Sequence, residues 1–337
     1  MYLLLAYMLT YDPSVLRVQG VAGGGGSPPA LIYQNRIIMS SYFDNKHLFS
    51  GTTVNQYGSH MVMDNVMKER KTKYVNIDTK FRDEYNYNLV SDYNITLPQR
   101  LTDVRNMSVV NVEMPMTFYN ISAALGNNAI LLTNGSTTRL LDISDGQYDA
   151  TSIMTALNAR KNGMGITDMS FSLVGTRTVI TSSATITKMN FDVDAMGNFA
   201  KTNFKSRLGW LLGFRSQFIS PTTTKTSDAF VDMTGSRYLY LVIDEFSSCG
   251  NQSSFISPLP MSLINKNVLA RISLDKTVYP FLSVLPANSD RYLISDTRSY
   301  TGKVDIQKLN VQIVNENGVI MNLNGADFSF CLRFEHE

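Results

Sequence analysis

The C-terminal stretch of the chain, residues 303–337, limits the fold more than any other part of the sequence. Its last apolar residues, Phe328, Phe330, Leu332 and Phe334, alternate with Ser329, Cys331, Arg333 and Glu335. Because successive side chains of a β-strand point to opposite faces, this spacing predicts a strand with one buried and one polar face. Cys331, on the polar side, is predicted to be a small packing residue.

The residues before this strand predict a β-hairpin. Apolar residues alternate from position 304 to 313, with a slip in phase at Gln307 and Lys308 that indicates a β-bulge. Residues 315–318, Asn-Glu-Asn-Gly, have the composition of a tight turn, and the alternation resumes over residues 319–323. A chain that ends in packed antiparallel strands is expected to build a sandwich or a shell.

The composition supports a large β-domain and excludes several functional classes. Of the 337 residues 44% are hydrophobic, which is enough for one large core or two smaller ones. The 30 lysines and arginines against 28 aspartates and glutamates give a net charge of only +2, so no specific nucleic-acid partner is expected. Two cysteines, Cys249 and Cys331, fit a reducing compartment, and the sequence leaves open whether they pair.

Residues 1–70 are predicted to form an extended arm. Residues 23–29, Gly-Gly-Gly-Gly-Ser-Pro-Pro, are typical of a flexible linker that stiffens at its end. Residues 1–11 are apolar but too short to span a bilayer, and no basic segment precedes them as in a secretory signal. Residues 68–73 carry four lysines or arginines and are predicted to be a solvated hinge, with contact to nucleic acid or an anionic membrane as the alternative.

Residues 71–337 are predicted to form an antiparallel, jelly-roll-like β-sandwich. Alternating runs that predict strands occupy residues 74–79, 93–97 and 104–114. Pro98 and Pro115 are predicted to close two of these strands. Residues 237–243 are apolar or aromatic almost throughout, which predicts a strand buried on both faces. The alternative of two smaller β-domains stays open.

A small α+β insertion is predicted within the sandwich, at residues 144–220. Apolar residues at helical spacing predict a helix over residues 150–160, with a stop at residues 161–163, Lys-Asn-Gly. Residues 169–181 predict a hairpin that turns at Gly175. Ahead of the insertion, the dipeptide Asn134-Gly135 between two β-forming runs is the strongest hairpin signal in the chain.

The sequence contains no constellation that predicts catalysis, a cofactor or a metal site. Its three histidines, His47, His60 and His336, have no metal-ligand spacing and are predicted to be solvated or packed. The adjacent carboxylates Asp83-Glu84 and Asp244-Glu245 would point to opposite faces of a strand, which does not suit an acid/base pair. They are predicted to be solvated strand ends. Trp210, among leucines, is predicted to anchor a core, with a sugar- or base-stacking platform as the alternative.

Several segments, taken in order, resemble minor capsid proteins of large icosahedral double-stranded DNA viruses, the nucleocytoplasmic large DNA virus type found in algae and amoebae. They are residues 74–83 (Tyr-Val-Asn-Ile-Asp-Thr-Lys-Phe-Arg-Asp), 93–98, 109–115, 145–148 (Asp-Gly-Gln-Tyr), 208–214 (Leu-Gly-Trp-Leu-Leu-Gly-Phe), 318–324 and 327–330 (Asp-Phe-Ser-Phe). The resemblance covers residues 74–337. Residues 1–70 match no part of that family.

This resemblance implies a non-enzymatic virion structural protein that packs against and cements neighbouring capsid proteins, with a penton-type position as one form. Its partners would be the major capsid protein and other minor capsid proteins, in a shell assembled in the host cytoplasm and in one arrangement close to an internal viral membrane. The resemblance implies no cofactor, no small-molecule substrate and no specific nucleic acid.

Aromatic residues of the arm are the predicted contact residues. Tyr42, Phe43, Phe49 and Tyr57 are expected to become ordered only on an adjacent subunit. The main alternative is a carbohydrate-binding attachment module on the virion surface, with loop aromatics stacked on sugars. An enzyme of the β-sandwich type would need a convergent acid/base constellation that the sequence does not reveal.

Overall fold

The computed structural model describes residues 70–87, 89–183, 188–199, 204–220, 223–246, 255 and 267–337. The chain divides into two units, Met1–Met67 and Lys68–Glu337, and the description below concerns the second. The predicted arm contacts Tyr42, Phe43, Phe49 and Tyr57 lie outside the described residues, as do His47, His60 and Cys249. The predicted arm therefore stays a prediction.

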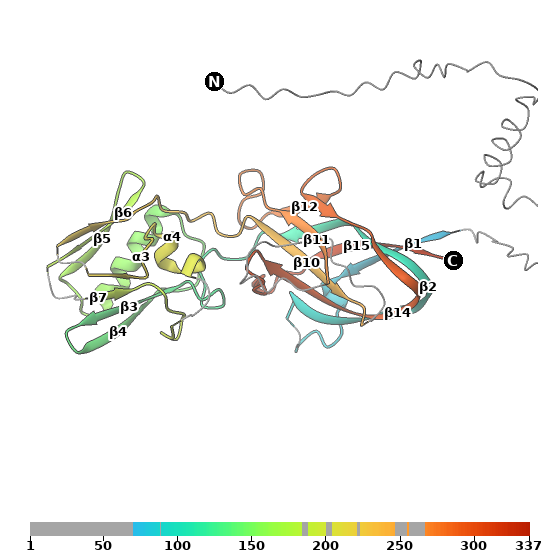
Figure 1. The fold of residues 1–337 in the computed structure, drawn as a ribbon, viewed down its shortest axis with the longest axis horizontal. Coiled ribbons are helices and arrows are strands. Elements are labelled where there is room, and N and C mark those ends of the chain that lie inside the picture. Colours follow the sequence, from blue (N-terminus) through green and yellow to red (C-terminus); the bar gives the residue numbers. More distant parts are fainter. Residues whose placement is uncertain are drawn as a thin grey trace, which may run out of the picture. The chain divides into compact units, whose positions relative to one another are not determined.

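The larger part of the described chain is a curled antiparallel sheet, the β-sandwich region (Figure 1). Its strands, in spatial order, are β1 (Lys71–Asp78), β15 (Ser329–His336), β2 (Asp92–Pro115), β14 (Arg298–Asn315), β10 (Tyr238–Asp244), β11 (Val268–Ser273) and β13 (Leu293–Ser295), with β12 (Val284–Asn288) beside β2. One continuous core of buried apolar side chains fills it. The prediction of a mainly β, jelly-roll-like antiparallel sandwich is confirmed.

Strand β2 is hydrogen-bonded to three other strands, and its course corrects one prediction. It pairs with β14 over residues 92–107, with β15 over residues 104–113 and with β12 over residues 111–115. Pro98 was predicted to close a strand, but β2 runs through it. Pairing with β14 passes from Thr96 directly to Leu101, so the ladder needs no N–H from Pro98. The same shift, between Ile306 and Lys308 on β14, confirms the predicted bulge.

The C-terminal strands match the sequence pattern except in one place. Phe328, Phe330, Leu332 and Phe334 are buried, as the alternation predicts. The return strand predicted over residues 319–323 is wrong, since the structure has only an isolated bridge between Val314 and Ile320. The side-chain oxygen of Asn315 accepts hydrogen bonds from the main-chain N–H groups of Asn317 and Val319, so the chain curls into a turn where a ladder would begin.

A second core defines the α+β region, which lies between β2 and β10 in the sequence. It holds a sheet in the order β4-β3-β7-β8 and a sheet in the order β5-β6-β9. The elements are β3 (Ala129–Asn134), β4 (Thr137–Asp142), α3 (Ala150–Gly163), β5 (Met169–Val174), β6 (Arg177–Ser182), β7 (Lys188–Asn190), η2 (Phe204–Ser206), α4 (Leu208–Leu211), β8 (Phe218–Ile219) and β9 (Thr224–Thr226). None of the described helices has the length and apolar character of a bilayer-spanning segment.

Most local predictions in this region are confirmed, but the helix predicted to stop at residues 161–163 includes them and ends at Gly163. Asn134 pairs with Thr137, so the β3–β4 hairpin turns at Gly135 and Ser136, and the β5–β6 hairpin turns at Gly175. Helix α3 begins at a capping box, in which Asp149 and Ser152 bond to each other's main-chain N–H. The limits predicted for the insertion, residues 144–220, remain a prediction, and the second core also takes in Ile121.

The segment 208–214 owes its two glycines to close packing. A Cβ atom at Gly209 would collide with Phe191, whose ring stacks on Phe214 with 4.8 Å between centroids. Gly213 adopts φ 94°, a left-handed conformation that glycine tolerates, and a side chain there would meet the carbonyl of Ala229. The pattern Leu-Gly-Trp-Leu-Leu-Gly-Phe therefore encodes a tight turn of the second core.

Candidate interaction surface

The two ends of the sandwich sequence meet in a buried polar junction. Asp78 caps the short helix η1 (Thr79–Phe81) by accepting a hydrogen bond from the N–H of Lys80. The buried hydroxyl of Thr79 donates to Asp327 at 2.8 Å and accepts from the N–H of Phe328 at 3.0 Å. Residues 78–82 and 327–328, two of the segments that carry the resemblance, are thus bound to one another.

Arg82 completes this junction and fixes the loop that follows. Its guanidinium lies 3.1 Å from the carboxylate of Asp327, and both side chains are largely buried. The same guanidinium donates to the carbonyls of Thr79 and Tyr85 and lies 4.0 Å from the centroid of the Tyr85 ring. An arginine that is ion-paired and hydrogen-bonded to two carbonyls is a rigid support, because its remaining freedom is small.

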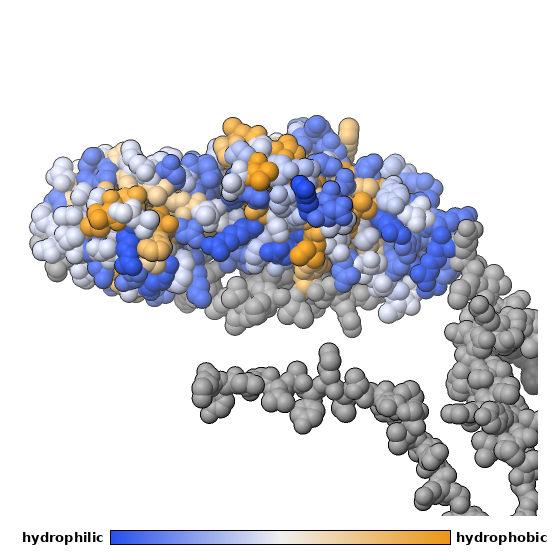
Figure 2. Space-filling model, turned by 90° about the horizontal axis from the view of Figure 1, so that it is seen from above, coloured by the Kyte–Doolittle hydropathy of each residue, from blue (hydrophilic) through white to orange (hydrophobic). Residues whose placement is uncertain are grey.

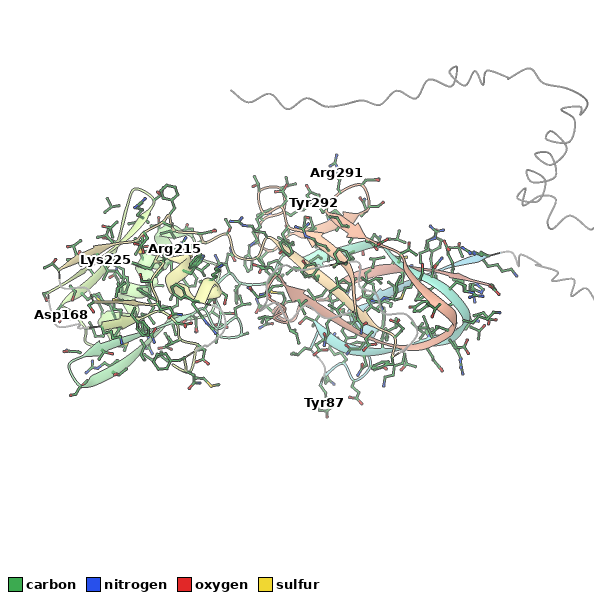
Figure 3. All side chains as sticks on the ribbon, in the orientation of Figure 1. Tyr87, Asp168, Arg215, Lys225, Arg291 and Tyr292 are labelled. Carbon is green, nitrogen blue, oxygen red and sulfur yellow. The ribbon has the colours of Figure 1, made fainter. Side chains whose placement is uncertain are left out.

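The loop fixed by Arg82 exposes large apolar side chains, and we call Phe81, Tyr85, Tyr87 and Leu89 the aromatic loop. Phe81 is 77% exposed, Tyr87 89% and Leu89 64%. Figure 3 shows Tyr87 projecting from the ribbon. Exposed apolar groups gathered on a rigid support are typical of a protein interface. Sequence reasoning placed the contact aromatics in the arm and missed this loop. The sequence did contain a signal for it: three aromatic residues lie between the strands predicted over residues 74–79 and 93–97.

A second exposed apolar group lies in the connection between β11 and β12 and at the first residue of β12. Val278, Leu282 and Val284 are exposed there, and Phe281 stacks on Tyr119 with 5.8 Å between ring centroids. Figure 2 shows apolar residues gathered in patches on the face seen from above, among otherwise polar ones. The β-sandwich region therefore presents two apolar surfaces from separate parts of the sequence.

The adjacent carboxylates do not converge on a reaction site, and the prediction that they are solvated is wrong for Glu245. Glu245 is 1% exposed and lies 2.5 Å from the guanidinium of Arg298, which is 5% exposed. Arg298 also donates to the carbonyls of Ile243 and Asn267. The strand over residues 238–244 is buried on both faces, so the residue that follows enters the interior and needs a cationic partner. Asp83 accepts from the hydroxyl of Thr96.

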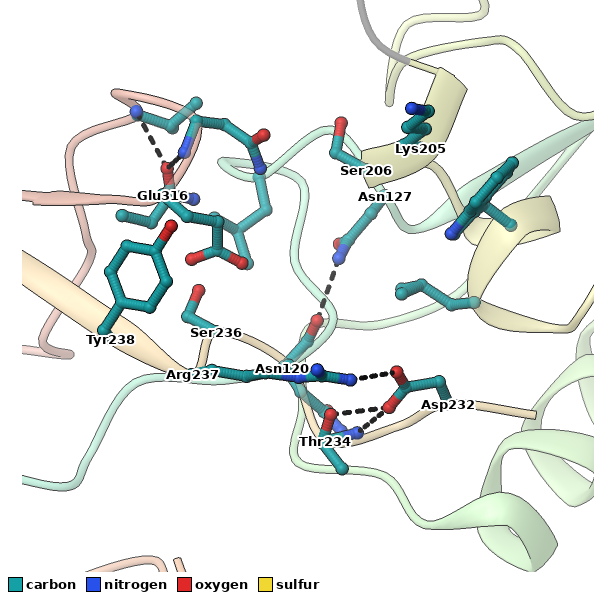
Figure 4. Close-up of a pocket in the computed structure, with 17 residues that line it drawn as sticks. Asn120, Asn127, Lys205, Ser206, Asp232, Thr234, Ser236, Arg237, Tyr238 and Glu316 are labelled. Atoms are coloured by element: carbon teal, nitrogen blue, oxygen red, sulfur yellow. Dashed lines mark hydrogen bonds and ion pairs between the residues drawn. The ribbon is translucent and has the colours of Figure 1, made fainter. Parts of the chain in front are cut away.

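A polar pocket of about 230 Å³ is drawn in Figure 4. The amide of Asn120 donates to the carbonyls of Tyr148 and Met233. Asp232 accepts from the hydroxyl of Thr234 and from the guanidinium of Arg237. Because these polar groups are engaged with one another, their evident role is to fasten chain segments together. They form no nucleophile and base pair.

A neighbouring hollow of about 770 Å³ is lined in part by Lys276. Burial lowers the pKa of this amine to about 8, against the opposing influence of Glu316 and Asp232. The Lys276 amine contacts the carbonyl of Thr234. No group of three or more histidine, cysteine or carboxylate side chains suited to a metal ion occurs in the described part of the chain.

Two residues singled out in the sequence prove to be packing residues. Trp210 lies half-buried at the margin of the second core, with its ring edge-on to Phe204 and one face covered by the guanidinium of Arg215 at 3.9 Å. Cys331 is buried and free, and burial raises the pKa of its thiol. A thiol that resists ionisation is a poor nucleophile, so it agrees with the predicted packing role.

Comparison with known proteins gives a family but no activity. A profile described as "Family of unknown function (DUF5901)" matches residues 61–324. The chain belongs to this family. No curated protein matches the sequence. Members of DUF5901 have, by that description, no assigned function, so the family leaves the role of the aromatic loop open.

Two solved structures are similar to the chain at a low level. The crystal structure of the mavirus penton protein has a TM-score of 0.37 and 12% identity, and covers 80% of this chain and 100% of that one. A chain of the Sputnik virophage structure determined by cryo-EM has a TM-score of 0.37 and 10% identity, and covers 79% of this chain and 98% of that one. Scores this low carry no argument about function.

Proposed function

We propose that this chain is a non-enzymatic structural protein of an icosahedral virion, a minor capsid protein that packs against neighbouring capsid proteins and cements them. A penton-type position is one form of this role. The motifs over residues 74–83 and 327–330 resemble minor capsid proteins, and a jelly-roll-like sandwich is the fold that the resemblance implies. The partners are capsid proteins, and the location is the shell of a virion assembled in the host cytoplasm.

The aromatic loop is the observation that carries this proposal. Its apolar side chains are exposed although the loop is anchored by a buried ion pair between Arg82 and Asp327. Exposing apolar area costs free energy in water, at about 25 cal/mol per Å², so a rigid loop that keeps it exposed is best explained by a protein partner. Phe81, Tyr85 and Tyr87 are of the residue types enriched at interface centres.

Incorporation into particles tests the proposal. The variant Tyr87→Ser with Leu89→Ser removes apolar area from the aromatic loop, and Val174→Ser, which changes an exposed residue of the β5–β6 hairpin, is the matched control. We expect the double variant to melt like the wild type but to enter gradient-purified particles at least tenfold less, by mass spectrometry. Equal incorporation of the double variant, or particles that lack the wild-type chain, would contradict the proposal.

Limited proteolysis tests the predicted arm separately. Residues 23–70 are expected to be cut in the isolated chain and protected in the particle, because contact with neighbours would order Tyr42, Phe43, Phe49 and Tyr57. Equal protection in both states would assign these residues to the chain's own core and favour a self-contained binding module. The hinge predicted over residues 68–73 is wrong for Lys71–Lys73, which are paired with β15 as part of β1.

A further inference from the structure

Strand β1 has one main-chain side without a partner strand. It lies at the end of the large sheet, and among the described strands it pairs only with β15 (Figure 1). The N–H of Thr79 donates to the carbonyl of Phe328, in the same register as the pairs of β1 with β15. Main-chain groups of successive residues point to alternate sides of a strand, so three residues of β1 direct theirs away from β15: Thr72, Tyr74 and Asn76. An open edge of this length is a template for a further strand.

The side chains of β1 alternate between the core and solvent. Ile77 is buried in the first core, and Val75 packs against that core. Thr72, Tyr74 and Asn76 lie on the opposite, outer face and are exposed, Tyr74 by 62%. The residues with open main-chain groups are therefore also the residues whose side chains would meet a neighbouring strand in solvent.

Opposite charges lie at the two ends of this outer face. Arg70 precedes the strand, and its guanidinium lies 4.0 Å from the carboxylate of Glu335, the residue opposite Thr72 on β15. The Arg70 side chain is 67% exposed, so this contact leaves most of it in solvent. At the other end, one carboxylate oxygen of Asp78 accepts a hydrogen bond from the N–H of Lys80. The second oxygen of Asp78 is bonded to no described residue.

The outer face of β1 is self-complementary about Tyr74. Arg70 lies four residues before Tyr74 and Asp78 four residues after it. Thr72 and Asn76 lie two residues away on either side. If two copies of the strand pair antiparallel about a two-fold axis at Tyr74, Arg70 of each copy lies opposite Asp78 of the other. The two Tyr74 rings then form a cross-strand pair.

The neighbouring registers place like charges opposite each other. A slip of two residues in one direction puts Lys73 opposite Lys73 of the second copy, and a slip in the other direction puts Arg70 opposite Lys80. Like charges directly opposite each other are destabilising. In the register centred on Tyr74, Lys73 lies opposite Val75 instead. The charge pattern therefore favours a second copy of this chain, in one register, as the partner of β1.

We propose that β1 pairs antiparallel with β1 of a second copy of this chain, so that two large sheets join across a two-fold axis at Tyr74. Main-chain hydrogen bonds form at Thr72, Tyr74 and Asn76, and Arg70 of each copy pairs with Asp78 of the other. Such an isologous interface closes on itself, so the assembly is a dimer. The inference goes beyond the proposed capsid function and does not rest on it, because assembly is measured on the purified chain.

Sedimentation of the full chain across a concentration series tests the proposal, and Tyr74→Pro is the first variant. Proline removes an N–H that makes no bond with β15, so the variant should melt like the wild type. Both Tyr74 N–H groups of the dimer lose their bond, so we expect the dimer to weaken at least about tenfold. Tyr74→Ser keeps the N–H and should weaken the dimer less. If Tyr74→Pro lowers the melting temperature, the variants below test the proposal in its place.

Charge variants test the proposed ion pair. Arg70→Glu places a carboxylate opposite Asp78 and should weaken the dimer at least about threefold. Adding Asp78→Asn removes the repulsion but keeps a side-chain oxygen for the N–H of Lys80, so it should restore part of the loss. The matched control is Arg291→Glu, which makes the same charge change at an exposed residue between β12 and β13 (Figure 3) and should leave the dimer unchanged.

Cysteine variants test the register. Tyr74→Cys places two thiols on opposite residues whose Cα atoms would lie about 5.5 Å apart, a distance that suits a disulfide. We expect oxidation to link this variant into covalent dimers. Thr72→Cys and Asn76→Cys place their thiols roughly 13 Å apart, at about 3.3 Å per residue, and should link no more than the wild type.

Several outcomes would overturn the proposal. One is a wild-type chain that stays monomeric at the highest concentration, which would leave the edge of β1 to an unrelated strand. Others are a dimer that Tyr74→Pro leaves intact, and equal linking of cysteines at positions 72, 74 and 76. A larger ring or a filament would also contradict it, because these assemblies need heterologous contacts.

Discussion

The β-sandwich region and the α+β region use charge in opposite ways. In the sandwich, Arg298 is buried against Glu245 and Arg82 against Asp327, and both guanidinium groups also satisfy main-chain carbonyls. In the α+β region, Arg177, Arg215 and Lys225 are exposed, and none forms an ion pair with a described carboxylate. Arg177 and Arg215 donate only to main-chain carbonyls, of Ser227 and of Trp210 and Phe214 respectively. The difference teaches that buried ion pairs fix the sandwich, whereas these cations of the α+β region lie at its surface.

Breaking the most buried pair should have the largest effect on stability. Arg298→Met leaves the Glu245 carboxylate buried without its cation, and we expect it to lower the free energy of unfolding by about 3–5 kcal/mol. Chemical denaturation of the variant and wild type measures this. The double variant Arg298→Met with Glu245→Leu should recover most of the loss, since it leaves no buried charge. A single-variant loss under about 1 kcal/mol would mean that water reaches the pair.

Removing Arg82 should have a smaller effect on stability and a local effect on the aromatic loop. Arg82→Met loses the ion pair to Asp327 and hydrogen bonds to two carbonyls, so we expect a loss of about 2 kcal/mol. Hydrogen exchange should become faster over residues 81–89, because the carbonyl of Tyr85 loses its support. Unchanged exchange in this loop would show that it is held by other contacts.

Lys276 offers a pH-dependent test of a cation that the fold tolerates poorly. Burial lowers its pKa to about 8, below its value in an unfolded chain near 10.4. The unfolded state therefore binds more protons between these two values, and this residue's contribution to stability should rise as pH increases from 8 to about 10. The unfolding free energy of the wild type minus that of Lys276→Met should increase over that window. A flat difference would contradict the lowered pKa.

Removing the exposed cations of the α+β region should have the smallest effect on stability. Arg177→Gln and Lys225→Gln break no ion pair with a described residue, so we expect changes within about 0.5 kcal/mol in thermal or chemical unfolding. Arg160→Gln, which breaks an exposed pair with Asp142, should also cost no more than about 0.5 kcal/mol. A loss near 2 kcal/mol at Arg177 or Lys225 would erase the contrast between the two regions.

Much of the fold was predictable because its signals are local. The Asn134-Gly135 turn, the cap at Asp149 and the alternation from Phe328 to Phe334 each act within a few residues. The errors came from choices that depend on neighbours. Pro98 lies inside β2 because the pairing with β14 passes from Thr96 to Leu101 without it. Residues 319–323 form no ladder because the side chain of Asn315 accepts hydrogen bonds from the N–H groups of Asn317 and Val319.

The interaction surface was less predictable, since its supports are distant in sequence. Thr79 and Arg82 meet Asp327 across more than 240 positions, and no periodicity relates them. Glu245 follows a strand end, which in most sheets is solvated, and its cationic partner Arg298 lies 53 positions further along the chain. The resemblance to minor capsid proteins includes both residues 74–83 and residues 327–330, but it does not predict that the two segments are in contact.

The pairing of β1 with β15 sets the order in which the chain can fold during synthesis. β1 (Lys71–Asp78) has β15 (Ser329–His336) as its antiparallel neighbour, and β15 is also the partner of the middle of β2. The sandwich cannot close until these late residues leave the ribosome, so its early strands wait with open edges. The α+β region builds its sheets from residues 129–226, so its contacts are complete more than a hundred residues earlier. A translating ribosome would thus hold a finished α+β region and an unfinished sandwich on one nascent chain.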